Sequence, residues 1–353
     1  MKCNKKFVWS FNDRTSIYLD DCNVLDGGEL FQFSSELEAE AFFDQCVKEL
    51  LADGWREQSI DNDEENKDFT LYQVDQIYLA LESRLDEFAN ATAKPYIEIT
   101  AHSTPETTLW QSKFGGLPYF PKHLEYPTTP DGIPLNLLAQ INFAETPKIE
   151  DFPEKGILQF YIDTAGEMTT YGLEDNPQLA QTTFRVLYFP EIDLNIDHLL
   201  NNFDFVPEFL GPLEEEQCLA LTFAVKSHPI SITDYQFKDF YKRYFSIFQQ
   251  TNLTEAMKMS LEEIADDFIY EYREKYEHLL EGHRLGGYPG FAQDDRRYSF
   301  MQEEGYDFLL FQMDSEHEHS IMWGDMGVGH FFIQPSAIKR LDFSKVLYTY
   351  ACS

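Results

Sequence analysis

The two halves of the chain carry similar sequence blocks, in the same order and at an almost constant separation. The first set is GGLPYF at 115–120, LLAQINFAE at 137–145 and GILQFYI at 156–162. The second set is GGYPGF at 286–291, LLFQMDSE at 309–316 and GVGHFFI at 327–333. Corresponding blocks lie 171 or 172 residues apart. A long period with two copies predicts a pseudo-symmetric domain and not a solenoid, with equivalent loops on both sides of a central seam.

The fold class that we expect is α+β, with an internally duplicated, pseudo-two-fold, β-rich domain that also contains helices. Strands that alternate with turns, followed by segregated helices, favour this class over a βαβ sheet. The internal repeats are expected at about 96–189 and 283–350. Strands are predicted at 96–100, 137–143, 157–162, 183–189, 218–225, 308–314 and 330–333, and helices at 71–88, after residue 236 and at 260–281.

Residues 1–58 are predicted to form a small α+β module of their own. Strands are expected at 7–11, 16–19 and 30–33. The capping box Ser35-x-x-Glu38 then introduces a helix with apolar residues at i, i+3, i+4 and i+7 spacing. Residues 59–70 include the polar, charged run at 61–68 and are predicted to be an acidic linker. The main domain is therefore expected to span 71–353.

The charge of the chain favours a basic partner. Lys and Arg number 27 against 62 Asp and Glu, for a formal net charge of −35 at pH 7. Such a surface repels phosphate backbones and anionic lipids, so we expect neither nucleic acid nor a membrane as a partner. A basic protein would be attracted, because opposite charge speeds encounter. Acidity also simply keeps a protein soluble, and this second interpretation stays open.

The cysteines and the first residues indicate a cytoplasmic protein. Five scattered cysteines form no CxxC pair, which argues against a disulfide framework or a zinc site and fits a reducing compartment. The opening MKCNKKFVWSFND lacks the apolar run of a signal peptide. No segment approaches the roughly 20 apolar residues of a membrane span.

No sequence motif identifies a reaction. The glycine pairs at 115–116 and 286–287 and the glycine-rich 324–329 fit no nucleotide-binding fingerprint, so we expect them to serve the backbone. His317 and His319 form an H-x-H, but their very polar surroundings favour an exposed turn over a metal site. A nucleophile elbow is absent. We therefore predict no catalytic residue, no metal and no cofactor.

Polar residues inside the repeated strands are candidate site residues. Gln140 and Asn142 in the first copy match Gln312 and Asp314 in the second. Strand alternation places each pair on one face. Such groups face solvent, form hydrogen bonds across the repeat, or line a binding surface at the seam.

Several blocks resemble the bacterial YwqG-like proteins. They are the repeated blocks above together with SKFGGLPYFPK at 112–122, HRLGGYPGFAQDD at 283–295, IMWGDMGVGHFFI at 321–333 and DFSKVLYTYACS at 342–353. The resemblance runs from about residue 78 to residue 353. It implies a soluble bacterial protein of compact α+β architecture, without an agreed activity. It also implies that the gene often lies near secreted-toxin modules, and a toxin-neutralising role for some members.

Residues 1–58 resemble a WGR domain through the segments 7–11 and 28–57 and through the order of strands and helix. The Trp-Gly-Arg of that domain is absent, and DDCN stands at 20–23 instead. Together with the acidic charge, this departure argues against the nucleic-acid role of the WGR domain.

The functional hypothesis is an immunity protein that neutralises a contact-delivered toxin by stoichiometric binding and occlusion of its active site. Acidic residues would speed association, and aromatic anchors would set the lifetime of the complex. Trp323 is either such an anchor or a buried structural residue. The alternatives are an enzyme that acts on a small molecule in a cleft between the repeats, and a scaffold protein. The predicted contacts are Trp55, Asp294, Asp295, Glu303, Glu304, Glu316, Glu318, Trp323 and Asp325.

Overall fold

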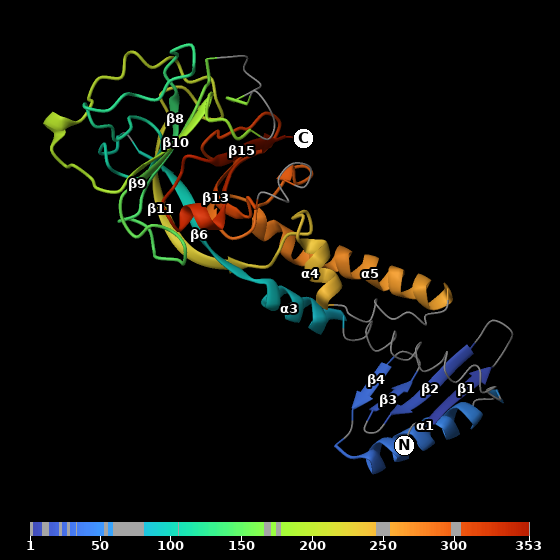
Figure 1. The fold of residues 1–353 in the computed structure, drawn as a ribbon. Helices are drawn as coiled ribbons and strands as arrows, with labels where there is room; N and C mark the ends of the chain where they lie inside the picture. Colours follow the sequence, from blue (N-terminus) through green and yellow to red (C-terminus); the bar gives the residue numbers. More distant parts are fainter. Residues whose placement is uncertain are drawn as a thin grey trace. The chain divides into compact units, whose positions relative to one another are not determined.

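The chain divides into two compact units, residues 1–88 with 242–272 and residues 89–241 with 273–353 (Figure 1). The division comes from a computed structural model, in which α3 (Leu81–Thr92), α4 (Phe237–Tyr244) and α5 (Glu255–Tyr276) each contribute residues to both units. The structure describes residues 3–8, 14–20, 23–26, 29–32, 34–52, 56–58, 81–104, 106–165, 171–173, 178–244, 255–297 and 305–352.

The smaller unit contains a five-stranded antiparallel sheet and a helix. The sheet has the order β4-β3-β2-β1-β5, formed by β1 (Cys3–Val8), β2 (Arg14–Asp20), β3 (Asn23–Asp26), β4 (Glu29–Gln32) and β5 (Arg56–Gln58). Helix α1 (Glu36–Ala52) begins where Ser35 Oγ accepts a hydrogen bond from Glu38 N, as the capping box predicts. Its apolar stripe, including Phe43 and Val47, packs on Leu19 and Val24. A second group in this unit is aromatic: Phe88 of α3 packs on Phe268 and Tyr272 of α5.

The larger unit is built on one antiparallel sheet of ten strands. Its order is β10-β9-β8-β7-β11-β6-β12-β13-β14-β15. The strands of the first half are β6 (Lys94–Ser103), β7 (Lys113–Gly115), β8 (Asn136–Asn142), β9 (Ile157–Ile162), β10 (Phe184–Phe189) and β11 (Cys218–His228). Those of the second half are β12 (His283–Gly286), β13 (Phe308–Asp314), β14 (Val328–Ile333) and β15 (Val346–Ala351). Short helices η1 (Ile196–His198), η3 (Glu277–Leu280) and α7 (Pro335–Ile338) lie in the connections.

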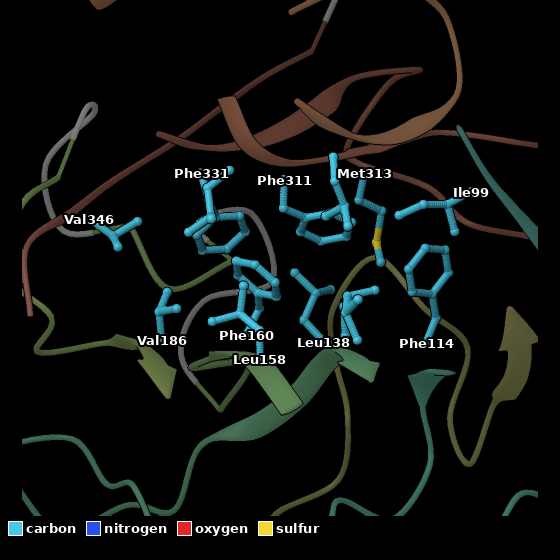
Figure 2. Packing of buried hydrophobic residues seen from close by; sticks show 14 of the residues in the cluster. Ile99, Phe114, Leu138, Leu158, Phe160, Val186, Phe311, Met313, Phe331 and Val346 are labelled. Carbon is cyan, nitrogen blue, oxygen red and sulfur yellow. The ribbon is translucent and has the colours of Figure 1, made fainter. Parts of the chain in front are cut away.

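The sheet curls into a nearly closed barrel. Its two wings, strands β7–β10 on one side and strands β12–β15 on the other, therefore face each other across one core. Phe160 of β9 lies 4.7 Å from Phe311 of β13 and 4.9 Å from Phe331 of β14 between ring centroids. Figure 2 shows these rings interleaved between the two layers of strands. Among the described residues, no helix is long and apolar enough to cross a membrane.

The two wings have matching strand positions. Strands β7, β8, β9 and β10 run outward from β11, and β12, β13, β14 and β15 run outward from β6, while β11 and β6 pair at the centre. In β8 the register shifts between Leu137 and Ala139, and in β13 it shifts between Leu309 and Phe311. These positions are 172 residues apart, as the sequence blocks are.

The predicted strand pairs 137–143 with 157–162, and 308–314 with 330–333, are confirmed. Two strands of the smaller unit, β3 and β5, were not predicted. Strand β1 begins at Cys3, four residues before the expected residue 7. Helix α3 continues to Thr92, beyond the expected end at 88. The smaller compact unit includes residues 242–272, and the expected domain boundaries stay a prediction. The predicted linker at 59–70 and the expected first residues of the helix at 71–88 lie outside the described residues.

Candidate functional site

A groove of about 720 Å³ opens in the first half of the larger unit. Residues 106–118 around β7, residues 201–209 and residues 213–218, which lead into β11, form most of its lining, and Tyr126, Asn136 and Leu137 complete it. The lining contains six carboxylates and no Lys, Arg or His. These carboxylates belong to Glu106, Asp204, Glu208, Glu214, Glu215 and Glu216.

The lining also contains apolar side chains. Leu117 lines the groove and is 51% exposed. The ring of Tyr126, also in the lining, lies 5.1 Å from that of Phe205, which is 46% exposed. An exposed apolar surface framed by acidic groups suits a partner segment that is both basic and apolar.

A glycine pair allows the wall at β7 to lie against β11. Gly115 and Gly116 have φ of 63° and 65°, a region that favours glycine. A Cβ on Gly115 would lie 2.2 Å from Gln217 O, and one on Gly116 would lie 2.7 Å from Cys218 Sγ. The Gly116 N–H donates to Gln217 O over 3.0 Å. The expectation that glycine is needed here for backbone conformation and close packing is therefore confirmed for Gly115 and Gly116.

A buried lysine fixes the loop on this side of the groove. Lys113 has no exposed surface, and its Nζ donates to Thr108 O over 2.6 Å and to Leu117 O over 2.9 Å. These bonds join the two ends of the loop that contains β7. Because burial disfavours the ammonium form, the pKa of Lys113 is lowered to about 8.

The opposite wall is held by amide and hydroxyl groups. Asn136, at the start of β8, donates from Nδ2 to Pro207 O over 2.8 Å and accepts from Thr164 Oγ1 over 2.8 Å. Tyr126 packs edge-on against Phe203. The segment 201–209 is thus tied to the sheet, so the groove is a built feature of the fold.

The groove has few groups that could perform chemistry. Its one sulfur, Cys218 Sγ, lies 3.4 Å from Thr107 Oγ1. The lining carries six carboxylates and no histidine or lysine, and the buried Lys113 lies near enough to Cys218 for their charges to interact. The acidic lining supports recognition of a cation.

The candidate polar residues of the first repeat are buried under the loops that cover the outer face of the sheet. Gln140 donates to Leu109 O and Gln111 O and accepts from Tyr119 N, each over 2.8 Å. Asn142 donates to Trp110 O over 3.0 Å and accepts from Ala144 N. These contacts join strand to loop within one repeat.

In the second half, Gln312 forms the same three bonds as Gln140. Gln312 donates to Leu280 O over 3.0 Å and to Gly282 O over 2.9 Å, and it accepts from Gly290 N over 2.9 Å. Each backbone partner lies 171 residues after its counterpart in the first repeat. Asp314 accepts from Gly282 N and Ser315 N, and burial raises its pKa. These side chains hold the covering loops and do not line a shared seam.

The predicted acidic contacts of the second repeat have different environments. Asp294, Glu318 and Asp325 are exposed. Glu316 is half-buried between His283 and His319, and its contact with His283 is the largest cause of its lowered pKa. Glu303 and Glu304 lie outside the described residues.

Asp295 was predicted to be an exposed contact, and this prediction is wrong. Its side chain is buried, and both of its oxygens accept from Arg297, over 3.0 Å from Nε and 2.8 Å from Nη2. Arg297 also donates to buried Asp234 over 2.8 Å. Asp295 is therefore part of an internal ion cluster and has no free carboxylate to offer a partner.

Of the two candidate anchors, the structure describes only Trp323, and it supports the structural alternative. Trp323 is completely buried, with its ring near those of Tyr171 and Tyr350. Gly329 makes room for it, since a Cβ there would lie 2.5 Å from the indole. Trp323 is thus a core residue and not an exposed anchor. Trp55 lies outside the described residues. His317 and His319 lie in a turn at 317–320, but only His317 is exposed, because the side chain of His319 packs against Glu316.

Comparison with known proteins places the chain in a family. None of the curated proteins matches it. Residues 112–352, which include both sets of repeated blocks and most of the groove, match the model described as a domain of unknown function (DUF1963). The chain therefore belongs to the DUF1963 family.

Proposed function

We propose that this protein binds a basic protein, and that the acidic groove receives a basic, partly apolar segment of that partner. The observation that carries the proposal is the lining of the groove, with six carboxylates, exposed Leu117 and no basic side chain. A lysine or arginine that enters would meet only opposite charge, and the net charge of −35 would draw it in from a distance.

The partner that we propose is a bacterial toxin, and the protein is its immunity protein. The likeness to YwqG-like proteins, some of which are encoded beside toxin modules, supports this choice. A toxin that acts on nucleic acid or nucleotides needs a basic active-site surface, since its substrate is anionic. Stoichiometric binding of that surface in the groove would occlude the active site.

The alternative, an enzyme with a cleft between the repeats, has less support. The groove is lined by residues 106–218, and a second cavity in the described part of the chain is lined by residues 273–328. Neither takes lining residues from both expected repeats.

Two features of the architecture belong to the same proposal. Duplication of an ancestral unit accounts for the matching bonds of Gln140 and Gln312 and for the matching register shifts. The resemblance of residues 1–58 to a WGR domain, and their role as an appended module, stay predictions.

The test is co-expression with a basic toxin found encoded beside this chain's gene, followed by gel filtration and a growth assay. We expect a one-to-one complex and protection from toxicity. The groove variant E214K/E215K should lose both. The matched control D294K/E318K makes the same charge change at exposed acids outside the groove and should keep both. If no complex forms while toxicity persists, the proposal is wrong, and protection far below one-to-one would indicate an enzyme.

A further inference from the structure

The second half of the larger unit has a cavity at a position that is filled in the first half. It measures about 450 Å³, and its lining includes Leu280, Glu281, Gly290 and Val328. Each of these residues lies 171 positions after a member of one apolar cluster of the first half. The four counterparts in that cluster are Leu109, Trp110, Tyr119 and Ile157.

Two changes between the halves create the space. Glu281 stands where the first half has Trp110, and Gly290 stands where it has Tyr119. Gly290 leaves no room for a side chain of its own, because a Cβ there would lie 2.5 Å from Leu280 O. The second half thus lacks two aromatic rings at this place.

In the first half, an extended segment of the chain also occupies this place. Leu199 is completely buried among the cluster residues. Its neighbours pair with the backbone of residues 120–122: Lys122 N donates to His198 O, and Leu200 N donates to Phe120 O, both over 2.8 Å. The segment therefore adds a short antiparallel pairing and inserts one apolar side chain.

The second half has the same backbone groups beside its cavity. Phe291 and Gln293 correspond to Phe120 and Lys122. Within the described part of the chain, no backbone group pairs with Phe291 O or Gln293 N. Phe291 and Ala292, with Met326 and Val328, give the cavity an apolar wall.

The rest of the lining is mainly acidic. It contains four carboxylates and two basic side chains: Glu274, Glu277, Glu281 and Asp314, with Arg273 and His278. Glu277 accepts from Ser231 Oγ at Oε1, while its buried Oε2 has no hydrogen-bond partner in the described part of the chain. An occupant with a basic residue would supply that partner.

We propose that this cavity is a second docking site, which binds an extended segment of a partner protein. The segment pairs its backbone with Phe291 O and Gln293 N, inserts an apolar side chain beside Leu280 and Val328, and places a basic side chain near Glu277. The size falls within the roughly 300–1,000 Å³ of ligand pockets, and strand addition is a common mode of peptide recognition. This site goes beyond the proposed function and uses none of the groove residues.

The experiment uses the full chain and three synthetic peptides in calorimetric titrations. The first peptide has the sequence of residues 190–201 with D193K and D197K, so it keeps the shape of the first-half segment but carries basic charge. The second is the unaltered, acidic segment. The third is the basic peptide with a methyl group on the backbone nitrogen of residue 200. We expect the first to bind, and the other two to bind roughly tenfold more weakly, through lost charge attraction and a lost hydrogen bond.

Two protein variants locate the site. E281W restores the aromatic residue of the first half and should abolish binding by filling the cavity. E277Q keeps the shape and should weaken binding of the basic peptide roughly fivefold, which covers the case that E281W does not fold. The matched control E318Q, at an exposed acid in the 317–320 turn, should bind as the native protein does.

The groove variant E214K/E215K separates this proposal from the function proposed above, because it should bind the basic peptide unchanged. If the basic peptide does not bind, or binds E281W and E277Q as well as it binds the native chain, the docking site is refuted. Equal affinity for the methylated peptide would overturn the backbone pairing.

Discussion

Gln159 on β9 and His330 on β14 occupy equivalent positions and bind equivalent carbonyl oxygens. Gln159 pairs across the sheet with Gln140, and His330 pairs with Gln312. Gln159 Nε2 donates to Tyr119 O over 2.7 Å, and His330 Nε2 contacts Gly290 O over 2.8 Å, which makes that nitrogen the protonated one. Both side chains are buried. An amide and an imidazole thus bind the equivalent backbone carbonyl in the two halves, but only the imidazole can ionise.

The first prediction exchanges one group for the other. We expect H330Q to unfold at about pH 7 with a free energy within about 1 kcal/mol of the native protein, because the first half accommodates glutamine at this place. H330L leaves the buried Gly290 carbonyl without its donor and should cost about 1 to 3 kcal/mol. Urea unfolding measures both. Equal losses in the two variants would show that the equivalence of the two positions is not energetic.

The second prediction concerns acid. Burial lowers the pKa of His330 from its ordinary 6.5 to about 3, because the imidazolium would be desolvated. Between those values the unfolded chain binds more protons than the folded one, so stability decreases as the pH falls from 6.5 towards 3. The H330Q variant has no ionisable group at this position, so it does not undergo this decrease in stability.

Relative to the native protein, H330Q should therefore gain about 2 to 3 kcal/mol between about pH 7 and pH 4.5. His228, whose pKa burial also lowers to about 3, is present in both proteins and cancels in the comparison. The measurement is urea unfolding of both proteins at the two pH values. A difference that does not change with pH would contradict this account.

The sequence predicts many of the strands and helices correctly, because the signals that specify them lie within short stretches of the chain. The strand at 157–162 is rich in strong β-formers, the strand at 137–143 is a short apolar-rich run, and α1 has a capping box and regular apolar spacing. These signals act within a few residues, and they survive in the structure. The candidate site needs information that no local pattern contains.

Gln140 illustrates that limit. A polar residue on a strand normally faces solvent, yet here a covering loop supplies carbonyls from residues 29 and 31 positions away. The groove is similar, because its walls come from segments that are far apart in the sequence and its carboxylates are six among 62 acidic residues. The one available signal was the run PLEEEQ at 212–217, placed between a glycine and a strand.

The third prediction compares two adjacent acids that look alike in the sequence. D295A leaves buried Arg297 with one carboxylate and should destabilise the protein by about 3 to 5 kcal/mol. D294A removes an exposed carboxylate and should change stability by less than about 0.5 kcal/mol. Thermal and urea unfolding test both. Equal effects would mean that the ion cluster of Asp234, Asp295 and Arg297 contributes little to the fold.

The fourth prediction separates charge from apolar contact in the groove, with the basic partner proposed above. E214K/E215K should slow association by roughly tenfold and make it less sensitive to salt, because long-range attraction acts before contact. L117D should leave association nearly unchanged but speed dissociation, because an apolar contact holds the formed complex. Stopped-flow or surface-plasmon kinetics at two salt concentrations distinguish the two effects. The matched control D294K/E318K changes the net charge by the same amount outside the groove. If that control slows association as much as E214K/E215K does, the total charge of the protein attracts the partner, and the groove has no special part in steering it.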